Sequence, residues 1–235
     1  MTPRRPVRGL FSQARITKGA LWLLLIELGF SLVALFASDE GKALIVDYLV
    51  ATDTNVWKDF KVWTLVTTMF VEPRFIGLLF HGLIMWMFMP ALEKWWGTKR
   101  FLYFAVGTSA TAALIGTLAG SFMAGGGAIA GLDAFIFASI VAYGVVFART
   151  QVYFFAVLPM TGKQLAWGMT AFVTLMVVLQ RDWATGAGWA SAMLLAFWLT
   201  NGLNPRLWWL QWRQRRVRRK LKVIRGGNDK SKWMN

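Results

Sequence analysis

Apolar residues occur along this chain in long runs, and polar and basic residues separate the runs. The runs cover residues 19–37, 75–92, 101–123, 132–148, 165–179 and 183–203. An α-helix needs about 20 predominantly apolar residues to cross the hydrocarbon core of a bilayer. The pattern predicts an all-α, polytopic membrane protein whose bundle contains six transmembrane helices. The fourth and fifth runs are near the short end of spanning length.

Two polar segments between the runs have patterns of their own. Residues 38–61 are too interrupted to span a bilayer, but Leu44–Val50 suits an amphipathic helix at the membrane surface. We therefore expect an interfacial segment between helices 1 and 2. The glycine-rich segment Ala124–Gly131 predicts a loop with unusual backbone dihedrals. The resulting domain division is a basic N-terminal tail (1–18), a six-span membrane domain (19–203) and a basic C-terminal tail (204–235).

Composition supports a membrane protein and narrows its chemistry. Of the 235 residues, 57% are hydrophobic and 16% are charged, whereas about a quarter of the residues in soluble domains are charged. The chain has no Cys, which excludes disulfides, thiolate metal ligands and a Cys nucleophile. A single His leaves little room for a His-rich metal site. We expect no cofactor and no metal.

The net charge of +15 gathers at the ends of the apolar runs. With the N-terminus inside, the inner segments of a six-span topology hold 21 of the 26 Lys and Arg residues, and the outer segments hold 5. Cytoplasmic loops carry such an excess of Lys and Arg, and an even number of spans leaves both basic ends inside. We predict an integral membrane protein of a bacterial inner membrane with both termini cytoplasmic.

The C-terminal tail alternates aromatic and basic residues. Those most relevant are Trp208, Trp209, Trp212, Arg213, Arg215 and Arg216. We interpret the tail as lipid-facing, with tryptophans in the interface and each cation worth about 1 kcal/mol on anionic headgroups. Contact with RNA is the alternative, because interleaved arginines and aromatics also suit nucleic acid. The position of the tail directly after a span already explains its composition, so we do not expect a nucleic-acid partner.

Four stretches resemble motifs of the rhomboid family of intramembrane serine proteases and their inactive relatives. Trp63-Thr-Leu-Val-Thr-Thr-Met-Phe70 is similar to the family's Trp-Arg-Leu-x-Thr-x-x-Phe before span two. Glu93, Gly97 and Arg100 match its Glu-x-x-x-Gly-x-x-Arg-Phe turn between spans two and three. The other two stretches are Gly131-Leu-Asp-Ala-Phe-Ile-Phe137, at the family's Gly-x-Ser-Gly-x-x-Phe, and Phe154–Gly168, at its loop before span five. The resemblance covers residues 57–203 and implies a rhomboid-like six-helix fold.

The same resemblance implies that the catalytic positions have been replaced. Rhomboid proteolysis requires a Ser on span four, a His on span six, and span-two donors that stabilise the oxyanion. Asp133 stands at the Ser position, and Ala184-Thr185-Gly-Ala-Gly188 places Thr185 at the His position. On span two the family's His-x-x-x-Asn becomes Gly77-x-x-x-His81. The resemblance therefore implies a pseudoprotease, with Gly188 kept as a packing position.

Asp133 has two interpretations. At the start of an apolar helix, an Asp caps free backbone N–H groups and interacts favourably with the positive helix end. Alternatively, the family geometry places span two and span four around one cavity, so that Asp133 pairs with His81 inside the membrane. Both interpretations stay open at this stage.

Other roles for the intramembrane polar residues receive less weight. His81 is a potential axial ligand of a haem or chlorin. Thr185, His81 and Asp133 would together supply the three groups of a rearranged hydrolytic relay. Glu27 lies within the first run and has three possible environments: a polar partner in the bundle, a wet cavity or a partner chain.

The function expected from the sequence is non-catalytic. A rhomboid-like protein without the catalytic residues would bind transmembrane partners, either as an accessory subunit of a membrane complex or as a client-binding pseudoprotease. The alternative is an intramembrane serine/threonine-type protease with unusual catalytic residues.

Overall fold

Capping and proline signals, rather than the edges of the apolar runs, set where the helices begin and end. The computed structural model describes residues 16–123, 126–154 and 158–201, so the predicted C-terminal tail and nearly all of the N-terminal tail lie outside the described residues. The helices are α1 (Lys18–Phe36), α2 (Asp39–Leu49), α3 (Asp53–Trp57), α4 (Thr64–Thr67), the 3-10 helix η2 (Thr68–Phe70), α5 (Phe75–Met87), α6 (Met89–Trp96), α7 (Thr98–Ser121), α8 (Asp133–Val146), α9 (Gly162–Gln180) and α10 (Trp183–Thr200).

Three of the helix boundaries have clear local causes. The run 75–92 is broken at Phe88 because Pro90, in the first turn of α6, cannot donate a backbone hydrogen bond. Gly97 has a φ of 79°, which a side-chain-bearing residue rarely adopts, and it separates α6 from α7. A capping box of Thr161 and Gln164 starts α9 earlier than the apolar run does.

Two short antiparallel strand pairs supplement the helices. β1 (Ala51–Thr52) pairs with β2 (Ala128–Ile129), and β3 (Gln151–Phe154) pairs with β4 (Leu158–Thr161). The first pair joins the segment after α2 to the glycine-rich loop, where Gly126 and Gly131 both have positive φ, as the loop prediction expected. The strands themselves were not predicted from the sequence.

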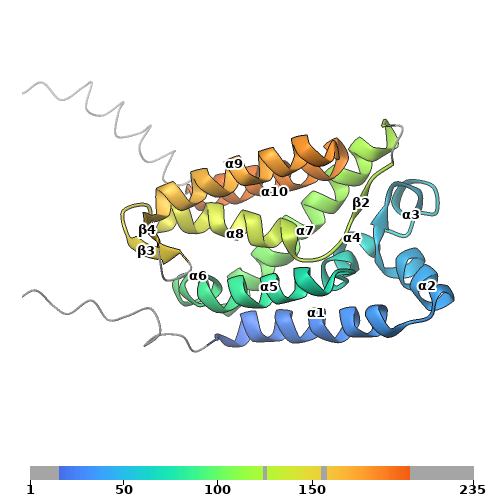
Figure 1. Cartoon of the computed structure of the whole chain (residues 1–235), viewed down its shortest axis with the longest axis horizontal. Coiled ribbons are helices and arrows are strands. Elements are labelled where there is room, and N and C mark those ends of the chain that lie inside the picture. Colours follow the sequence, from blue (N-terminus) through green and yellow to red (C-terminus); the bar gives the residue numbers. More distant parts are fainter. Residues whose placement is uncertain (1–15, 124–125, 155–157, 202–235) are drawn as a thin grey trace, which may run out of the picture. The chain divides into compact units, whose positions relative to one another are not determined.

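The chain passes back and forth between two ends of the bundle (Figure 1). At one end, the Glu93 carboxylate accepts a hydrogen bond from the start of α1, and the ring centroids of Trp95 and Phe147 lie 6.0 Å apart. At the other end, β1 pairs with β2, and the Thr185 hydroxyl reaches the Ala128 carbonyl at 3.4 Å. Among the described residues, the segments that the sequence predicted to be inside therefore share one end, and those predicted to be outside share the other.

Each of the six predicted runs is helical in the described residues, with α5 and α6 sharing the second run, but the exact count of six membrane spans is not confirmed. Among the described residues, α1, α7 and α9 are long and apolar enough to cross a membrane. The α4–η2 segment and α5 would count as a fourth span if joined, although they are bent by 87°. At 14 residues, α8 is only about 21 Å long, against a hydrocarbon thickness of about 30 Å.

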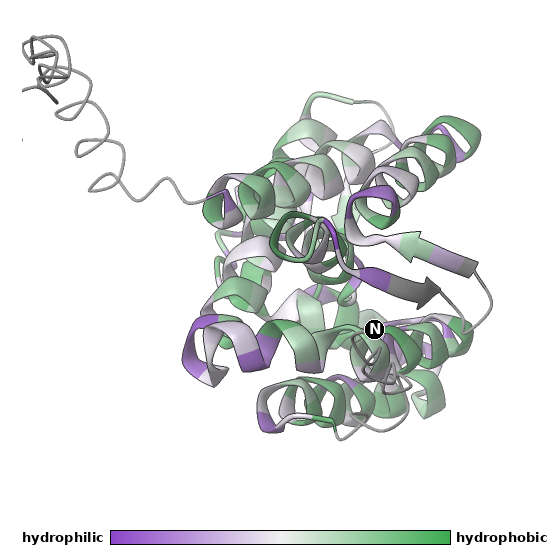
Figure 2. Cartoon of the chain, turned by 90° about the vertical axis from the view of Figure 1, so that its left-hand side faces the viewer, coloured by the Kyte–Doolittle hydropathy of each residue, from purple (hydrophilic) through white to green (hydrophobic). Residues whose placement is uncertain are grey.

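Burial places α8 at the centre of the bundle. Its side chains are buried around the whole helix, including Phe135, Ile136 and Ile140, as expected for an apolar helix surrounded by others. The outer helices instead expose large apolar residues, such as Phe36 (87%) and Leu194 (69%). Figure 2 shows that hydrophobic residues predominate along the helices. The exposure fits a lipid surrounding.

The predicted interfacial segment contains α2, which Ser38 caps by accepting from the Gly41 N–H at 3.2 Å. No residue of α2 is buried. Lys61 pairs with Asp47 at 2.5 Å, and this hydrogen bond is the main cause that raises the pKa of the half-buried Lys61 amine. The segment therefore lies on the bundle as an amphipathic element.

Glu93 joins three segments at the α6 end of the bundle. Its carboxylate accepts from the backbone N–H groups of Gly19 (2.8 Å) and Ala20 (2.9 Å) and from the hydroxyls of Thr17 and Thr98. Four donors on one carboxylate satisfy free N–H groups at the first turn of α1 and place a negative charge at that positive helix end. The rhomboid-like turn of the sequence is thus a structural junction.

We predict that Glu93→Gln lowers the free energy of unfolding by about 1–3 kcal/mol, because a charged acceptor of buried donors is lost. Burial by itself would raise the pKa of Glu93, but the four hydrogen bonds outweigh it and lower the pKa from 4.5. The stabilisation should thus be complete at neutral pH and be lost as pH falls through the lowered pKa. Thermal unfolding in detergent across this pH range, with exposed Glu40→Gln as control, tests this. A pH-independent difference would contradict it.

Candidate functional site

A cluster of charged side chains lies at the N-terminal end of α8. The first residue of α8, Asp133, is partly recessed in the bundle, with a side chain 18% exposed. Asp133 is the first helical residue, and its hydrogen bonds go to the side chains of His81 and Arg74. The capping interpretation of Asp133 is therefore replaced by a side-chain network, although its charge still suits the helix end.

His81 is the centre of this network. Its Nδ1 lies 2.6 Å from Glu27 Oε1 on α1, and its Nε2 lies 3.0 Å from Asp133 Oδ1 on α8. Carboxylates accept but do not donate, so both contacts are hydrogen bonds when the ring carries a proton on each nitrogen. The imidazole thereby links three helices. Glu27 is completely buried, and His81 is 1% exposed.

Arg74 and Glu72, which precede α5, complete the network. Arg74 donates to Asp133 Oδ2 at 3.2 Å through its guanidinium and to Glu72 Oε1 at 2.9 Å through Nε. The Glu72 carboxylate is fully buried, and its backbone N–H donates to the Ser31 hydroxyl at 2.8 Å. The site thus contains three carboxylates, one guanidinium and one imidazole, in the order Glu27, His81, Asp133, Arg74 and Glu72.

Two glycines make room for Glu72. A Cβ atom at Gly77 or at Gly131 would collide with the Glu72 carboxylate, and the Gly131 position also lies 3.4 Å from His81 Cε1. Gly131 has a φ of 76°, so a side chain there would be strained as well as crowded. The small residues at these two positions are therefore part of the architecture of the site.

The structure brings together three of the four residues that the rhomboid resemblance aligns with catalytic positions. Gly77, His81 and Asp133 surround Glu72, whereas Thr185 lies at the start of α10. The Thr185 backbone N–H donates to Asp182 Oδ1 at 3.0 Å, and its hydroxyl donates to the Ala128 carbonyl. Both nitrogens of His81 already face carboxylates, so the relay of Thr185, His81 and Asp133 is not assembled in this structure.

The remaining residues of the rhomboid-like motifs lie where structural roles are expected. Trp63 donates from its indole to the Tyr48 carbonyl at 3.0 Å, and Arg100 is exposed on the first turn of α7. A Cβ at Gly188 would lie 2.7 Å from the Ala112 carbonyl oxygen and 3.3 Å from Gly116 Cα. The glycine of the last helix therefore allows close packing against α7.

Sequence reasoning missed Glu72 and Arg74 as site residues. A signal was present, because both are ionisable residues directly before an apolar run, and Pro73 between them excludes a continuous helix. Glu27 was noticed, but its partner was not identified. Within the described residues, Glu72, His81 and Asp133 also form a group whose potential metal-ligand atoms all lie within 4.8 Å of one another.

These features define the protein as an α-helical integral membrane bundle with a buried, ion-paired centre. The chain belongs to the family described as eukaryotic integral membrane protein (DUF1751), whose model matches residues 20–200. No curated protein matches this sequence. The match confirms an integral membrane protein and is consistent with a rhomboid-like one. A family described as eukaryotic does not favour the bacterial membrane that we expected.

We predict that His81 and Asp133 are energetically coupled. His81→Ala and Asp133→Ala should each destabilise the protein, because each leaves a buried charge with one partner fewer. The double variant should cost less than the sum of the two, by about 0.5–3 kcal/mol. Thermal unfolding of the four proteins in one detergent measures the difference. Additive losses would show that the 3.0 Å contact contributes no coupling energy.

Proposed function

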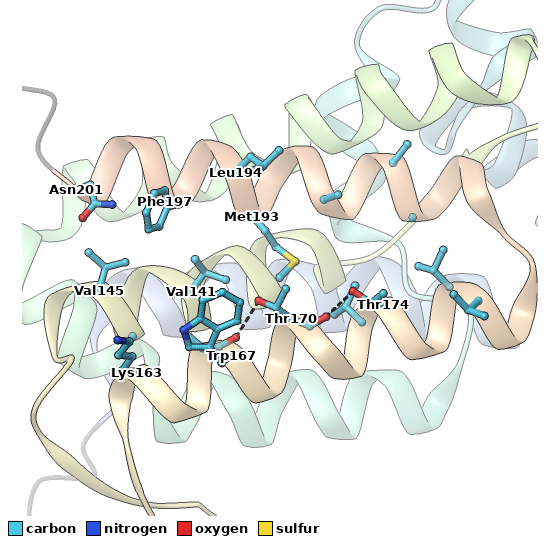
Figure 3. Close-up of a pocket in the computed structure, with 18 of the residues that line it drawn as sticks. Val141, Val145, Lys163, Trp167, Thr170, Thr174, Met193, Leu194, Phe197 and Asn201 are labelled. Carbon is cyan, nitrogen blue, oxygen red and sulfur yellow. Dashed lines mark hydrogen bonds between the residues drawn. The ribbon is translucent and has the colours of Figure 1, made fainter.

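We propose that this protein is a non-catalytic, rhomboid-like membrane protein that binds transmembrane helices of other proteins. The observation that carries the proposal is an apolar groove of about 940 Å³ bordered by α8, α9 and α10. Figure 3 shows α9 and α10 side by side, with the labelled side chains between them. The groove lies on the side of α8 formed by its last residues and therefore does not include the charged site.

The charged site supports the non-catalytic half of the proposal. A serine-type protease needs a hydroxyl nucleophile hydrogen-bonded to a base. In this structure the two nitrogens of His81 face Glu27 and Asp133, and Asp133 also accepts from Arg74. Two of the residues that the resemblance aligns with catalytic positions, His81 and Asp133, are committed to ion pairs, which hold α1, α5 and α8 together.

The lining of the groove suits a helix. Small residues, which let two helices approach closely, recur along it. They are Ala148, Ala187 and Ala190, whereas the glycines Gly144 and Gly186 make room for Ala166 and Val177 of α9. The hydroxyls of Thr170 and Thr174 donate to the carbonyls of Ala166 (2.9 Å) and Thr170 (2.8 Å) on their own helix. An occupant of the groove therefore does not need to accept hydrogen bonds from them.

Length and charge indicate which occupant fits. The groove follows α9 from Lys163 to Val178, which is about 22 Å of helix. One leaflet is about 15 Å thick, so an acyl chain would fill only part of the groove, whereas a spanning helix fills all of it. Lys163 and Asn201 lie at the same end (Figure 3). We therefore propose a transmembrane helix with an acidic residue at that end.

This occupant is tested with apolar spanning peptides reconstituted with the protein in nanodiscs. A photo-crosslinking amino acid at Ala187 should capture a peptide with a terminal Glu about five-fold better than one with a terminal Lys, since a surface ion pair contributes up to about 1 kcal/mol. Lys163→Glu should reverse this preference. Filling the groove with Ala190→Trp should abolish capture of both peptides.

The matched control is a crosslinker at Leu199, which is 51% exposed on α10 but does not line the groove. Equal capture at Leu199 and Ala187, or capture that ignores peptide charge, would contradict the proposed binding site. Recovery of peptides cut within their spans, with cleavage lost in Thr185→Ala, would instead establish the alternative protease.

We also propose that both termini are cytoplasmic. The distribution of Lys and Arg supports this orientation, and the end of the bundle that contains Glu93 and Lys163 would then face the cytoplasm. A partner helix would present its acidic residue at that end. This holds whether the protein acts as an accessory subunit of a complex or as a client-binding pseudoprotease.

The orientation predicts the labelling pattern of single cysteines, which the chain allows because it has no native Cys. A Cys at exposed Lys42, between α1 and α4, should react with a membrane-impermeant maleimide in intact cells. A Cys at exposed Lys99 should react only after the cells are permeabilised. The opposite pattern would invert the topology, and labelling of both positions in intact cells would contradict a crossing between them.

A further inference from the structure

Glu72 has an incomplete set of partners for a buried carboxylate. Its Oε1 accepts from the backbone N–H of Arg74 at 3.1 Å and from the Arg74 Nε at 2.9 Å. Its Oε2 is buried and has no hydrogen-bond partner among the described residues. An unpaired carboxylate oxygen in an apolar bundle is costly, so it indicates a missing positive ligand.

The free oxygen of Glu72 faces two other potential ligands. It lies beside the position where Gly131 would carry a Cβ, and His81 Cε1 is 3.4 Å from that position. Potential ligand atoms of Glu72, His81 and Asp133 all lie within 4.8 Å of one another, and His81 Nε2 and Asp133 Oδ1 are already 3.0 Å apart. Ligands of a tetrahedral ion with bonds of about 2.0–2.1 Å are about 3.3 Å apart. Binding of an ion would therefore bring the more distant ligand atoms, which lie within 4.8 Å of one another, to about 3.3 Å.

The charge balance of the site also favours a bound cation. The three carboxylates of Glu27, Glu72 and Asp133 face one permanent cation, Arg74. A proton on both nitrogens of His81 leaves one negative charge uncompensated, whereas a divalent ion beside a neutral imidazole compensates all three carboxylates. Buried charges in a membrane are tolerated when they are paired in this way.

Glu27 supplies the support that metal-bound histidines usually have. Such a histidine donates its second ring N–H to a carboxylate, which fixes the tautomer and the ring orientation. In this structure His81 Nδ1 lies 2.6 Å from Glu27 Oε1, leaving Nε2 directed to the other carboxylates. The arrangement of Glu27, His81 and the two ligand carboxylates is thus that of a supported metal site.

We propose that Glu72, Asp133 and Nε2 of His81 bind one divalent first-row transition-metal ion of the zinc class, with Glu27 as the positioning residue. On binding, Nε2 of His81 loses its proton to solvent, and the ion takes its place between the ring and the carboxylates. An imidazole with two carboxylates suits Zn²⁺ and leaves a fourth position for water. The sequence alone argued against a metal because it contains one His, and Glu72 was not then recognised.

The test titrates Zn²⁺ into chelator-treated full-length protein in detergent. We expect one ion per chain, proton release into the buffer, and a melting temperature raised by about 5–10 °C when Zn²⁺ is at about 100 times its Kd. Co²⁺ should give visible absorption bands typical of a four- or five-coordinate ion. Binding should be lost in Glu72→Gln and weakened about 10–100-fold in Glu27→Gln.

Glu93→Gln is the matched control, because it alters a buried carboxylate far from this site and should leave Zn²⁺ affinity unchanged. If wild-type protein binds no Zn²⁺, or if Glu72→Gln and Asp133→Asn both bind it as tightly as wild type does, the proposal is overturned. The titration of the wild-type protein tests the proposal even if a variant fails to fold. The proposal does not depend on the groove, so failure of peptide capture would leave it unaffected.

Discussion

The need to neutralise charge inside an apolar bundle dominates this structure. Glu27, His81 and Glu72 are almost completely buried, and each would be expensive to place there alone. The contacts among them arise from α1, α5 and the segment before α5, and Asp133 adds α8. Four parts of the chain must therefore adopt one relative arrangement for the charges to meet. Hydrophobic packing makes the bundle, whereas the ion pairs specify which helix faces lie against each other.

Sequence patterns predicted the helical class and the approximate position of every long helix, because apolar runs of spanning length have few other structures available. They did not predict the break at Phe88, the strand pairs or the early start of α9, which depend on local hydrogen bonding. The site was only partly predictable. The family resemblance connected His81 with Asp133. Glu72 and Arg74 lie before a helix, where no hydrophobic periodicity indicates which side chains face the bundle. Their importance follows from an 87° bend between the α4–η2 segment and α5. Pro73 indicates a break in the helix at this point, but it does not determine the direction in which the chain turns.

The rhomboid-like turn and the replaced catalytic positions have different physical roles in the same scaffold. Glu93 accepts four hydrogen bonds at one end of the bundle, so its structural role does not depend on the chemistry of the residues at the centre. At the centre, Gly77 and Gly131 have no side chain because Glu72 occupies the space. The buried carboxylate and the two glycines are therefore a coordinated set of residues, since each one is accommodated by the others.

The pairing of Glu27 with His81 has a consequence for how the protein is made. The two residues are 54 positions apart, so α1 leaves the ribosome before its partner exists. At about 5–20 residues per second, synthesis delays His81 by roughly 3–11 s, and Asp133 follows later still. Throughout this interval α1, although apolar enough to span the membrane, carries an unpaired acid that is costly there. The arrival of α5 removes this cost, so the first helix reaches its full stability in the membrane only after the second has been inserted.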